Sequence, residues 1–172
     1  GLIITVPGKT GHCLGISAHV DTLGAMVRSV TSEGKLKLIS VGGFTMESIE
    51  GMYCKVHTRT GKTYTGTILT TSPSVHVQDD ARTLERKEKH MEVRLDEVVH
   101  NAEDVAELEI GTGDFISFDP MFVYTESGFI KSRHLDDKAS VAVLMGVLKD
   151  MAEQKFVPEM TVKLLISNFE EV

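Results

Sequence analysis

The sequence has 172 residues, 41% of them hydrophobic, which is enough for one ordinary domain or two small ones. Its 25 acidic and 18 basic side chains give a formal net charge of −7, which argues against a nucleic-acid or anionic-membrane partner. Only two cysteines occur, neither in a C-x-x-C pair, and no apolar run reaches the roughly 18 residues of a membrane span. Because no leader-like segment precedes the first strand, we expect a soluble cytoplasmic protein.

The two ends of the sequence lie within or beside expected strands. Residues 1–6 read as a strand from the start, and Val172 directly follows a strand and two carboxylates. Natural domains more often begin and end in polar, frayed segments. We therefore expect a fragment of a longer chain.

The first half is expected to be mostly strands, because short runs rich in Ile and Val alternate with Gly and Pro turn signals. These runs are residues 2–6, 14–20, 23–30, 36–39, 53–59 and 62–69. Thr60-Gly61 marks a hairpin between the last two runs. The mixed-sign stretch 78–90 is more typical of a solvated loop or short helix than of a binding patch.

The next stretch continues in short elements. Asn101 and the acids after it predict a short capped helix over 101–108, because carboxylates favour the first turn of a helix. Short strands are expected at 114–118, 122–125 and 129–131.

The architecture changes after Ser132. Residues 136–151 have apolar side chains at helical spacing around most of the expected helix's circumference, which predicts a helix in the interior. Residues 160–167 then read as a buried strand, so the end of the chain has an α/β character. Because residues 31–131 are nearly all β, we infer an all-β module inserted into an α/β domain formed by 1–30 and 132–172.

Three short motifs could carry chemistry. His19 and Asp21 lie two apart at the end of a strand, so both side chains project from one face. A histidine beside a carboxylate is suited to bind a metal, since the second ring nitrogen of such a ligand is normally held by an acceptor. His-x-Asp also occurs often by chance, and this pair alone is weak support for a metal site.

The other two motifs are pairs of acids at the ends of regular elements. Asp136 and Asp137 begin the apolar helix; helix capping accounts for one of them but less well for two. Glu170 and Glu171 follow a strand, where sites in open α/β sheets gather, although a solvated loop is the simpler interpretation of an isolated Glu-Glu.

Together the three motifs supply an imidazole and several carboxylates, a donor set that suits zinc, cobalt or manganese. A two-metal hydrolase needs a carboxylate that bridges the metals and a further glutamate that takes a proton from water and returns it. The sequence therefore indicates a candidate site for metal-assisted hydrolysis.

The motifs also carry a resemblance to a known family. They read Ser17-Ala18-His19-Val20-Asp21-Thr22-Leu23-Gly24, Arg133-His134-Leu135-Asp136-Asp137-Lys138 and Asn168-Phe169-Glu170-Glu171-Val172. In order and spacing they resemble the signatures of the dinuclear-metal aminopeptidases of metallopeptidase family 42, the tetrahedral, deblocking or glutamyl aminopeptidases. The resemblance spans essentially the whole chain. It implies a zinc-peptidase-like α/β catalytic domain and identifies the all-β module with that family's inserted domain, a small barrel or PDZ-like fold.

The resemblance also implies a role for each site residue. His19 would bind one metal, with Asp21 behind it as a supporting catalytic residue. Asp136 would bridge the two metals, Glu171 would bind the other metal, and Glu170 would be the general base. Asp137 would not be a ligand, which fits a helix-capping or supporting role, and His134 would be structural.

The chain departs from the family pattern in three places. Lys138 stands where arginine is common, and Thr22 where an acid is common, so contacts near the site are expected to differ. The family takes two more ligands, an Asp and a His, from sequence after the position of Glu171. The 172 residues alone are therefore expected to be inactive and to bind metal weakly or not at all.

The function that these observations favour is a cytoplasmic, homo-oligomeric aminopeptidase that uses two divalent metal ions, zinc or cobalt before manganese, to shorten peptides from the N-terminus. One alternative is a non-catalytic assembly or interaction module, in which the acids are only capping and solvated groups. Another is a metal hydrolase of an acylated amino acid or a glycan, because metal ligands do not encode the substrate.

Overall fold

The structure, a computed structural model, describes residues 1–172, which form two compact units. One unit contains Gly1–Thr22 and Pro120–Val172, and the other contains Leu23–Asp119. None of the helices is both long and apolar enough to span a membrane.

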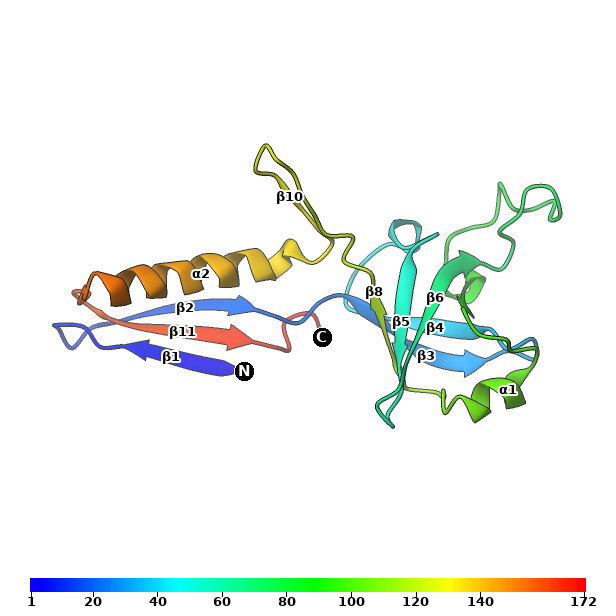
Figure 1. The fold of residues 1–172 in the computed structure, drawn as a ribbon, viewed down its shortest axis with the longest axis horizontal. Coiled ribbons are helices and arrows are strands. Elements are labelled where there is room, and N and C mark those ends of the chain that lie inside the picture. The colour runs from blue at the N-terminus through cyan, green and yellow to red at the C-terminus, as the bar shows by residue number, and fades with distance from the viewer. The chain divides into compact units, whose positions relative to one another are not determined.

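The first unit is built on a three-stranded sheet. Its strands are β1 (Leu2–Val6), β2 (Cys13–His19) and β11 (Thr161–Ser167), in the order β1-β11-β2. The central strand β11 runs antiparallel to β1 and parallel to β2 (Figure 1). Its side chains alternate, with Leu164 and Ile166 buried, as expected for a strand that packs on one face.

Helix α2 (Leu135–Glu153) lies along one face of this sheet (Figure 1). Four apolar side chains of α2 at helical spacing are partly buried: Val141, Leu144, Leu148 and Met151. No residue of the helix is fully buried, and Val143 and Val147 remain 65% and 51% exposed. The expectation of an interior helix is therefore wrong for these residues, because the sheet covers only one side of α2.

The turn after β1 packs closely on the segment that leads into β11. Added to Gly8, a Cβ atom would lie 2.2 Å from the main chain of Met160, so only glycine fits there. The neighbouring amides of Lys9 and Thr10 donate to the carbonyl of Glu159 at 3.1 and 2.9 Å. This contact fixes where β11 enters the sheet.

A short hairpin completes the first unit. Its strands are β9 (Val123–Tyr124) and β10 (Ile130–Lys131), which pair antiparallel. Phe122 and Phe129 are 63% and 73% exposed, so this hairpin presents apolar side chains on its surface.

The second unit is a closed six-stranded barrel, which agrees with the expectation of an all-β module. The strand order is β3-β4-β7-β6-β5-β8. The strands are β3 (Gly24–Val30), β4 (Leu36–Val41), β5 (Tyr53–His57), β6 (Thr63–Thr70), β7 (Met91–Leu95) and β8 (Phe115–Phe118). Closure gives every strand two neighbours and leaves no free sheet edge.

Apolar side chains from every strand fill the barrel, including Val27, Leu36, Leu38, Val56, Ile68, Met91, Val93 and Ile116. Helix α1 (Ala102–Glu107) follows β7, and its cap residue Asn101 accepts the amides of Glu103 and Asp104 as the sequence predicts. Two single-turn 3₁₀ helices, η1 (Met46–Ser48) and η2 (Glu88–His90), complete the unit.

The unit boundaries differ from the expected divisions at residues 30/31 and 131/132. The structure divides the chain at 22/23 and 119/120 instead. Strand β3 belongs to the barrel because it pairs with β4 and β8. The β9–β10 hairpin belongs to the first unit. Pattern along the sequence shows that a strand exists but not which distant strand it pairs with.

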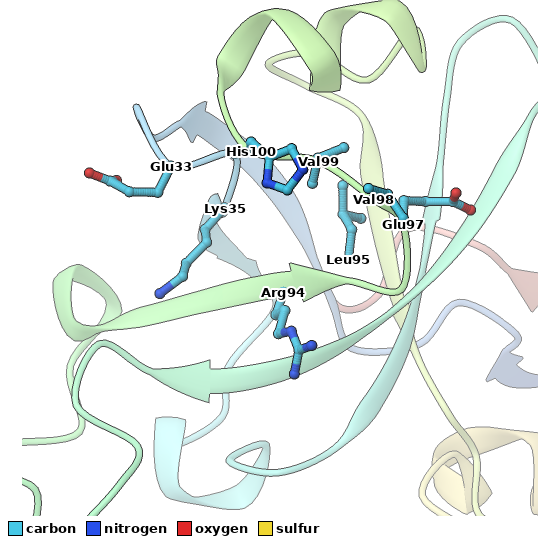
Figure 2. A pocket seen from close by; sticks show the side chains of 9 residues that line it. Glu33, Lys35, Arg94, Leu95, Glu97, Val98, Val99 and His100 are labelled. Atoms are coloured by element: carbon cyan, nitrogen blue, oxygen red, sulfur yellow. The ribbon is translucent and has the colours of Figure 1, made fainter. Parts of the chain in front are cut away.

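The barrel unit has a cavity of about 230 Å³ beside β7 and the turn before β4. Lys35, Arg94 and His100 bring basic groups to its lining, and Glu33 and Glu97 bring acids that point away from each other (Figure 2). The lining carries both signs of charge and none of the residues expected to act in catalysis.

Candidate metal centre

The fold brings the three sequence motifs together within the first unit. Strands β2 and β11 are parallel and paired through His19 and Ser167, so their carboxyl ends meet at one edge of the sheet. His19 is the last residue of β2, and Glu170 and Glu171 follow the end of β11. Asp136 arrives at the same edge from the start of α2. This is the position where sites of open α/β sheets form.

The imidazole of His19 is held in one orientation. The side chain is buried, and its Nδ1 lies 3.1 Å from the main-chain oxygen of Asp21. Because a carbonyl oxygen only accepts hydrogen bonds, Nδ1 carries a proton, and Nε2 is the ring nitrogen that faces the acids. That Nε2 lies 3.2 Å from Asp136 Oδ1 and 3.7 Å from Glu170 Oε2.

The donor atoms of the site converge. His19, Glu170 and Glu171 each offer one ligand atom, and these atoms all lie within 4.8 Å of one another. The carboxylate of Asp136 adds a fourth donor, and its side chain is 89% exposed. Glu170 stands inside the cluster, where it could serve as a ligand or as a base.

The charges at the site shift the pKa values of its members. Burial lowers the pKa of His19, but the carbonyl of Asp21 and the carboxylates of Asp136 and Glu170 outweigh it and raise the pKa overall. Burial raises the pKa of Glu171, and the nearby charge of Glu170 raises it further. Both shifts follow from the burial of these groups and from the acids that lie beside them.

Asp21 is turned toward the Glu170–Glu171 segment. Its Oδ2 accepts the amides of Glu170 and Glu171 at 3.0 and 2.9 Å. These bonds, led by that from Glu171, lower the pKa of Asp21 although burial opposes them. Its Oδ1 is buried without a hydrogen bond and lies 3.4 Å from Nδ1 of His19.

Asp137 stands at the start of the helix and contacts the site. The backbone at Asp136 and Asp137 is not helical, so regular helix begins after Asp137. The Oδ2 of Asp137 lies 3.4 Å from the amide nitrogen of His19, which points away from β11 at the edge of the sheet. Asp137 therefore supports the site from the helix side, a contact that no sequence signal revealed.

The sequence matches a known protein family along its whole length. The family model described as M42 glutamyl aminopeptidase matches residues 1–172. The chain belongs to the M42 glutamyl aminopeptidase family. It is 53% identical over 173 residues to YhfE of Bacillus subtilis (strain 168), a protein named provisionally as an aminopeptidase. That alignment covers 100% of this chain and 50% of YhfE.

Two solved peptidase structures share the fold. The TET aminopeptidase of Thaumarchaeota archaeon SCGC AB-539-E09 matches with a TM-score of 0.85 and 24% identity, covering 99% of this chain and 46% of that one. The Pyrococcus horikoshii TET1 peptidase, described as assembling into a tetrahedron or a large octahedral shell, matches with a TM-score of 0.79 and 25% identity. Here the coverage is 99% of this chain and 49% of that one. The chain thus spans about half the length of the relatives it matches.

Proposed function

We propose that the full-length protein is a metal-dependent aminopeptidase that removes N-terminal residues from short peptides. Family membership supports peptide hydrolysis, and the convergence of His19 Nε2 with the carboxylates supports the use of metal. His19, Asp136 and Glu171 are the proposed ligands, with Asp136 as the bridge between two ions. The carrying observation is that His19 Nε2 faces two carboxylates while Nδ1 is held by a main-chain oxygen.

The residues present fit divalent ions. An imidazole nitrogen and carboxylate oxygens are donors that zinc, cobalt and manganese accept. Acids crowded around Nε2 repel one another; burial raises the pKa of Glu171, and the charge of Glu170 raises it further. A cation between these groups would remove the repulsion.

Bound divalent ions would supply Lewis acidity, which polarises a scissile carbonyl and acidifies water. Glu170 is the proposed general base: it takes a proton from the attacking water and delivers it to the leaving amine. Asp21 and Asp137 hold the surrounding main chain through the amides of Glu170, Glu171 and His19.

The partners and the location are also proposals. The name of the family supports peptide substrates, and the shells formed by TET1 peptidase support a homo-oligomer. The few cysteines and acidic charge support a cytoplasmic location. Because the relatives are about twice as long, we propose that further ligands, an Asp and a His, lie outside residues 1–172. These 172 residues alone would then bind zinc weakly, and tight binding of two zinc ions to them would contradict this.

The test is Glu170→Gln in the full-length protein, assayed on aminoacyl amides with zinc, cobalt and manganese. The account predicts that kcat falls roughly a hundred- to ten-thousand-fold while bound metal per subunit is unchanged. Glu159→Gln, at an exposed acid of the same unit, is the matched control and should keep the activity.

Hydrolysis by Glu170→Gln at a near-normal rate would remove Glu170 from the general-base role. A wild-type protein that binds metal but hydrolyses no aminoacyl amide would favour another hydrolase substrate. Absence of both metal binding and hydrolysis would favour the assembly module.

A further inference from the structure

The hydrogen bonds between β2 and β11 end where the functional segments begin. The last strand partners are His19 and Ser167, followed by a bond from the Val20 amide to the Ser167 carbonyl at 2.9 Å. Beyond that point the Glu170–Glu171 segment is joined to the end of β2 through the side chain of Asp21. Here a side-chain carboxylate, rather than a main-chain carbonyl, accepts the amide hydrogen bonds that join the two segments.

The hydrogen bonds separate two roles that one aspartate could have. The proton on Nδ1 of His19 is directed at the main-chain oxygen of Asp21, at 3.1 Å, and any residue at position 21 retains that oxygen. The carboxylate oxygen nearest Nδ1 is farther, at 3.4 Å, and makes no hydrogen bond. The orientation of the imidazole therefore does not depend mainly on the Asp21 side chain.

The other carboxylate oxygen makes the bonds that only a side-chain acceptor can make. Asp21 Oδ2 accepts two successive amides, those of Glu170 and Glu171, at 3.0 and 2.9 Å. Successive amides that converge on one anionic oxygen form a concave anion-binding arrangement of the main chain. Because the two amides flank the Cα atom of Glu170, the bonds fix the directions in which both glutamate side chains leave the chain.

We propose that the Asp21 side chain is a positioning residue for Glu170 and Glu171, the proposed base and ligand, rather than for His19. The proposal rests on the function proposed above for those two glutamates. Without the acceptor, the segment after β11 loses its bonds to β2, and the base and ligand no longer share a fixed geometry. Misplacement of reacting groups by about 1 Å can cost on the order of a hundredfold in rate.

The experiment compares Asp21→Asn with Asp21→Leu in the full-length protein. Asparagine keeps an oxygen that can accept both amides but loses the charge, whereas leucine has similar size and no acceptor. Asp79→Asn, in a loop of the barrel unit, is the matched control for the Asp-to-Asn exchange. The readouts are amide hydrogen exchange at Glu170 and Glu171, zinc bound per subunit, and kcat separately from KM.

The expected pattern separates the two variants. In Asp21→Leu, exchange of the two amides should rise at least about tenfold and kcat should fall about a hundredfold or more. In Asp21→Asn, exchange should stay within about threefold of wild type and kcat should fall at most about tenfold, because the acceptor remains. Asp21→Ala, which also lacks the acceptor, replaces the leucine variant if that variant does not fold.

The opposite pattern would overturn the proposal. If both variants lose kcat equally while exchange at Glu170 and Glu171 is unchanged, the carboxylate acts through its charge on His19. A large loss of kcat in Asp21→Asn, with amide exchange at Glu170 and Glu171 unchanged, would overturn the proposal by itself. A wild-type protein without peptidase activity would refute the proposed function yet leave the exchange result intact, so the two failures can be told apart.

Discussion

The charge balance of the candidate centre depends on His19. Its Nδ1 donates to the main-chain oxygen of Asp21, so Nε2 is the ring nitrogen that faces the nearby acids. A metal ion or a proton can occupy that position, but not both. Metal binding to this site is therefore expected to weaken as protons compete for Nε2 at lower pH.

The two cysteines are expected to differ sharply in reactivity. Cys54 is buried in the barrel core, and burial raises the pKa of its thiol to about 12, with the charge of Asp96 as a smaller cause. Cys13 lies exposed on β2. Because the thiolate is the reactive form, iodoacetamide at neutral pH should label Cys13 and leave Cys54 unlabelled until the protein unfolds. Mass spectrometry of the peptides checks this, and labelling of both residues at equal rates would show that the barrel core is open.

Glu88 is expected to stabilise the barrel unit in a pH-dependent way. The hydroxyl and then the amide of Ser40 donate to its carboxylate and lower its pKa from the usual 4.5. A lowered pKa means that this stabilisation is complete above pH 4.5 and is lost as the pH falls through the lower value of the folded state.

Glu88→Gln should reduce the free energy of unfolding by about 1 kcal/mol at neutral pH, since the group is only half-buried. The difference from wild type should shrink as the pH falls below 4.5, in urea unfolding followed by circular dichroism. A difference that stays constant over this range would exclude the charge of Glu88 as its cause.

Sequence motifs predicted which residues would lie together better than how those residues contact one another. His19, Asp136, Glu170 and Glu171 lie together in the structure, as three motifs at the ends of regular elements predict. The bonds of Asp21 to the amides of Glu170 and Glu171 could not be predicted, since they join residues 149 and 150 positions apart. Such contacts depend on the strand order, which local pattern does not contain.

At the scale of elements, the strand pairing between β4 and β7 of the barrel is short, and we call this place the β4–β7 seam. Leu36 and Val93 are the one pair of strand partners there, whereas β5 and β6 share five. Beside that pair, the buried carboxylate of Glu92 binds Lys35 at 2.6 Å and Lys37 at 3.3 Å. The ion pairs therefore join the two strands where the main-chain ladder is short.

Removing the cations should cost more than removing the acid. Lys35→Met combined with Lys37→Met leaves the Glu92 carboxylate, 7% exposed, without a partner and should cost about 3–5 kcal/mol of unfolding free energy. Glu92→Gln leaves two lysines whose side chains are 42% and 24% exposed and can turn to water, so we expect about 1 kcal/mol. Urea unfolding of the variants measures both values. The reverse order would mean that the seam does not depend on a buried charge.

Strand pairing shows where sequence reasoning stops. Residues 2–6 and 14–20 were expected as neighbouring strands along the chain, and both strands form. In the sheet they are separated by β11, which comes about 140 residues later. Strand β7 was not predicted at all, although Met91, Val93 and Leu95 are all buried. The buried Glu92 between them breaks the apolar alternation, and β7 pairs with β6 and with the more distant β4.

At the scale of the whole molecule, the chain combines a barrel with a sheet and helix that hold the candidate centre. All members of the centre belong to one unit, and the inserted barrel contributes none of them. Composition and pattern predicted an all-β module, and the barrel agrees with that expectation. The places where the units meet could not be predicted, because β3 looks like any other strand until its partners are known.

The most direct measurement of the central claim is anomalous diffraction at the zinc edge from crystals of the full-length protein grown with zinc. The account predicts a peak within bonding distance of His19 Nε2 and an oxygen of Asp136, and a second peak shared by Asp136 and Glu171. Zinc peaks that are bound only by other residues would contradict the proposed metal centre. The absence of a peak near His19, in crystals where other zinc sites are fully occupied, would also contradict it.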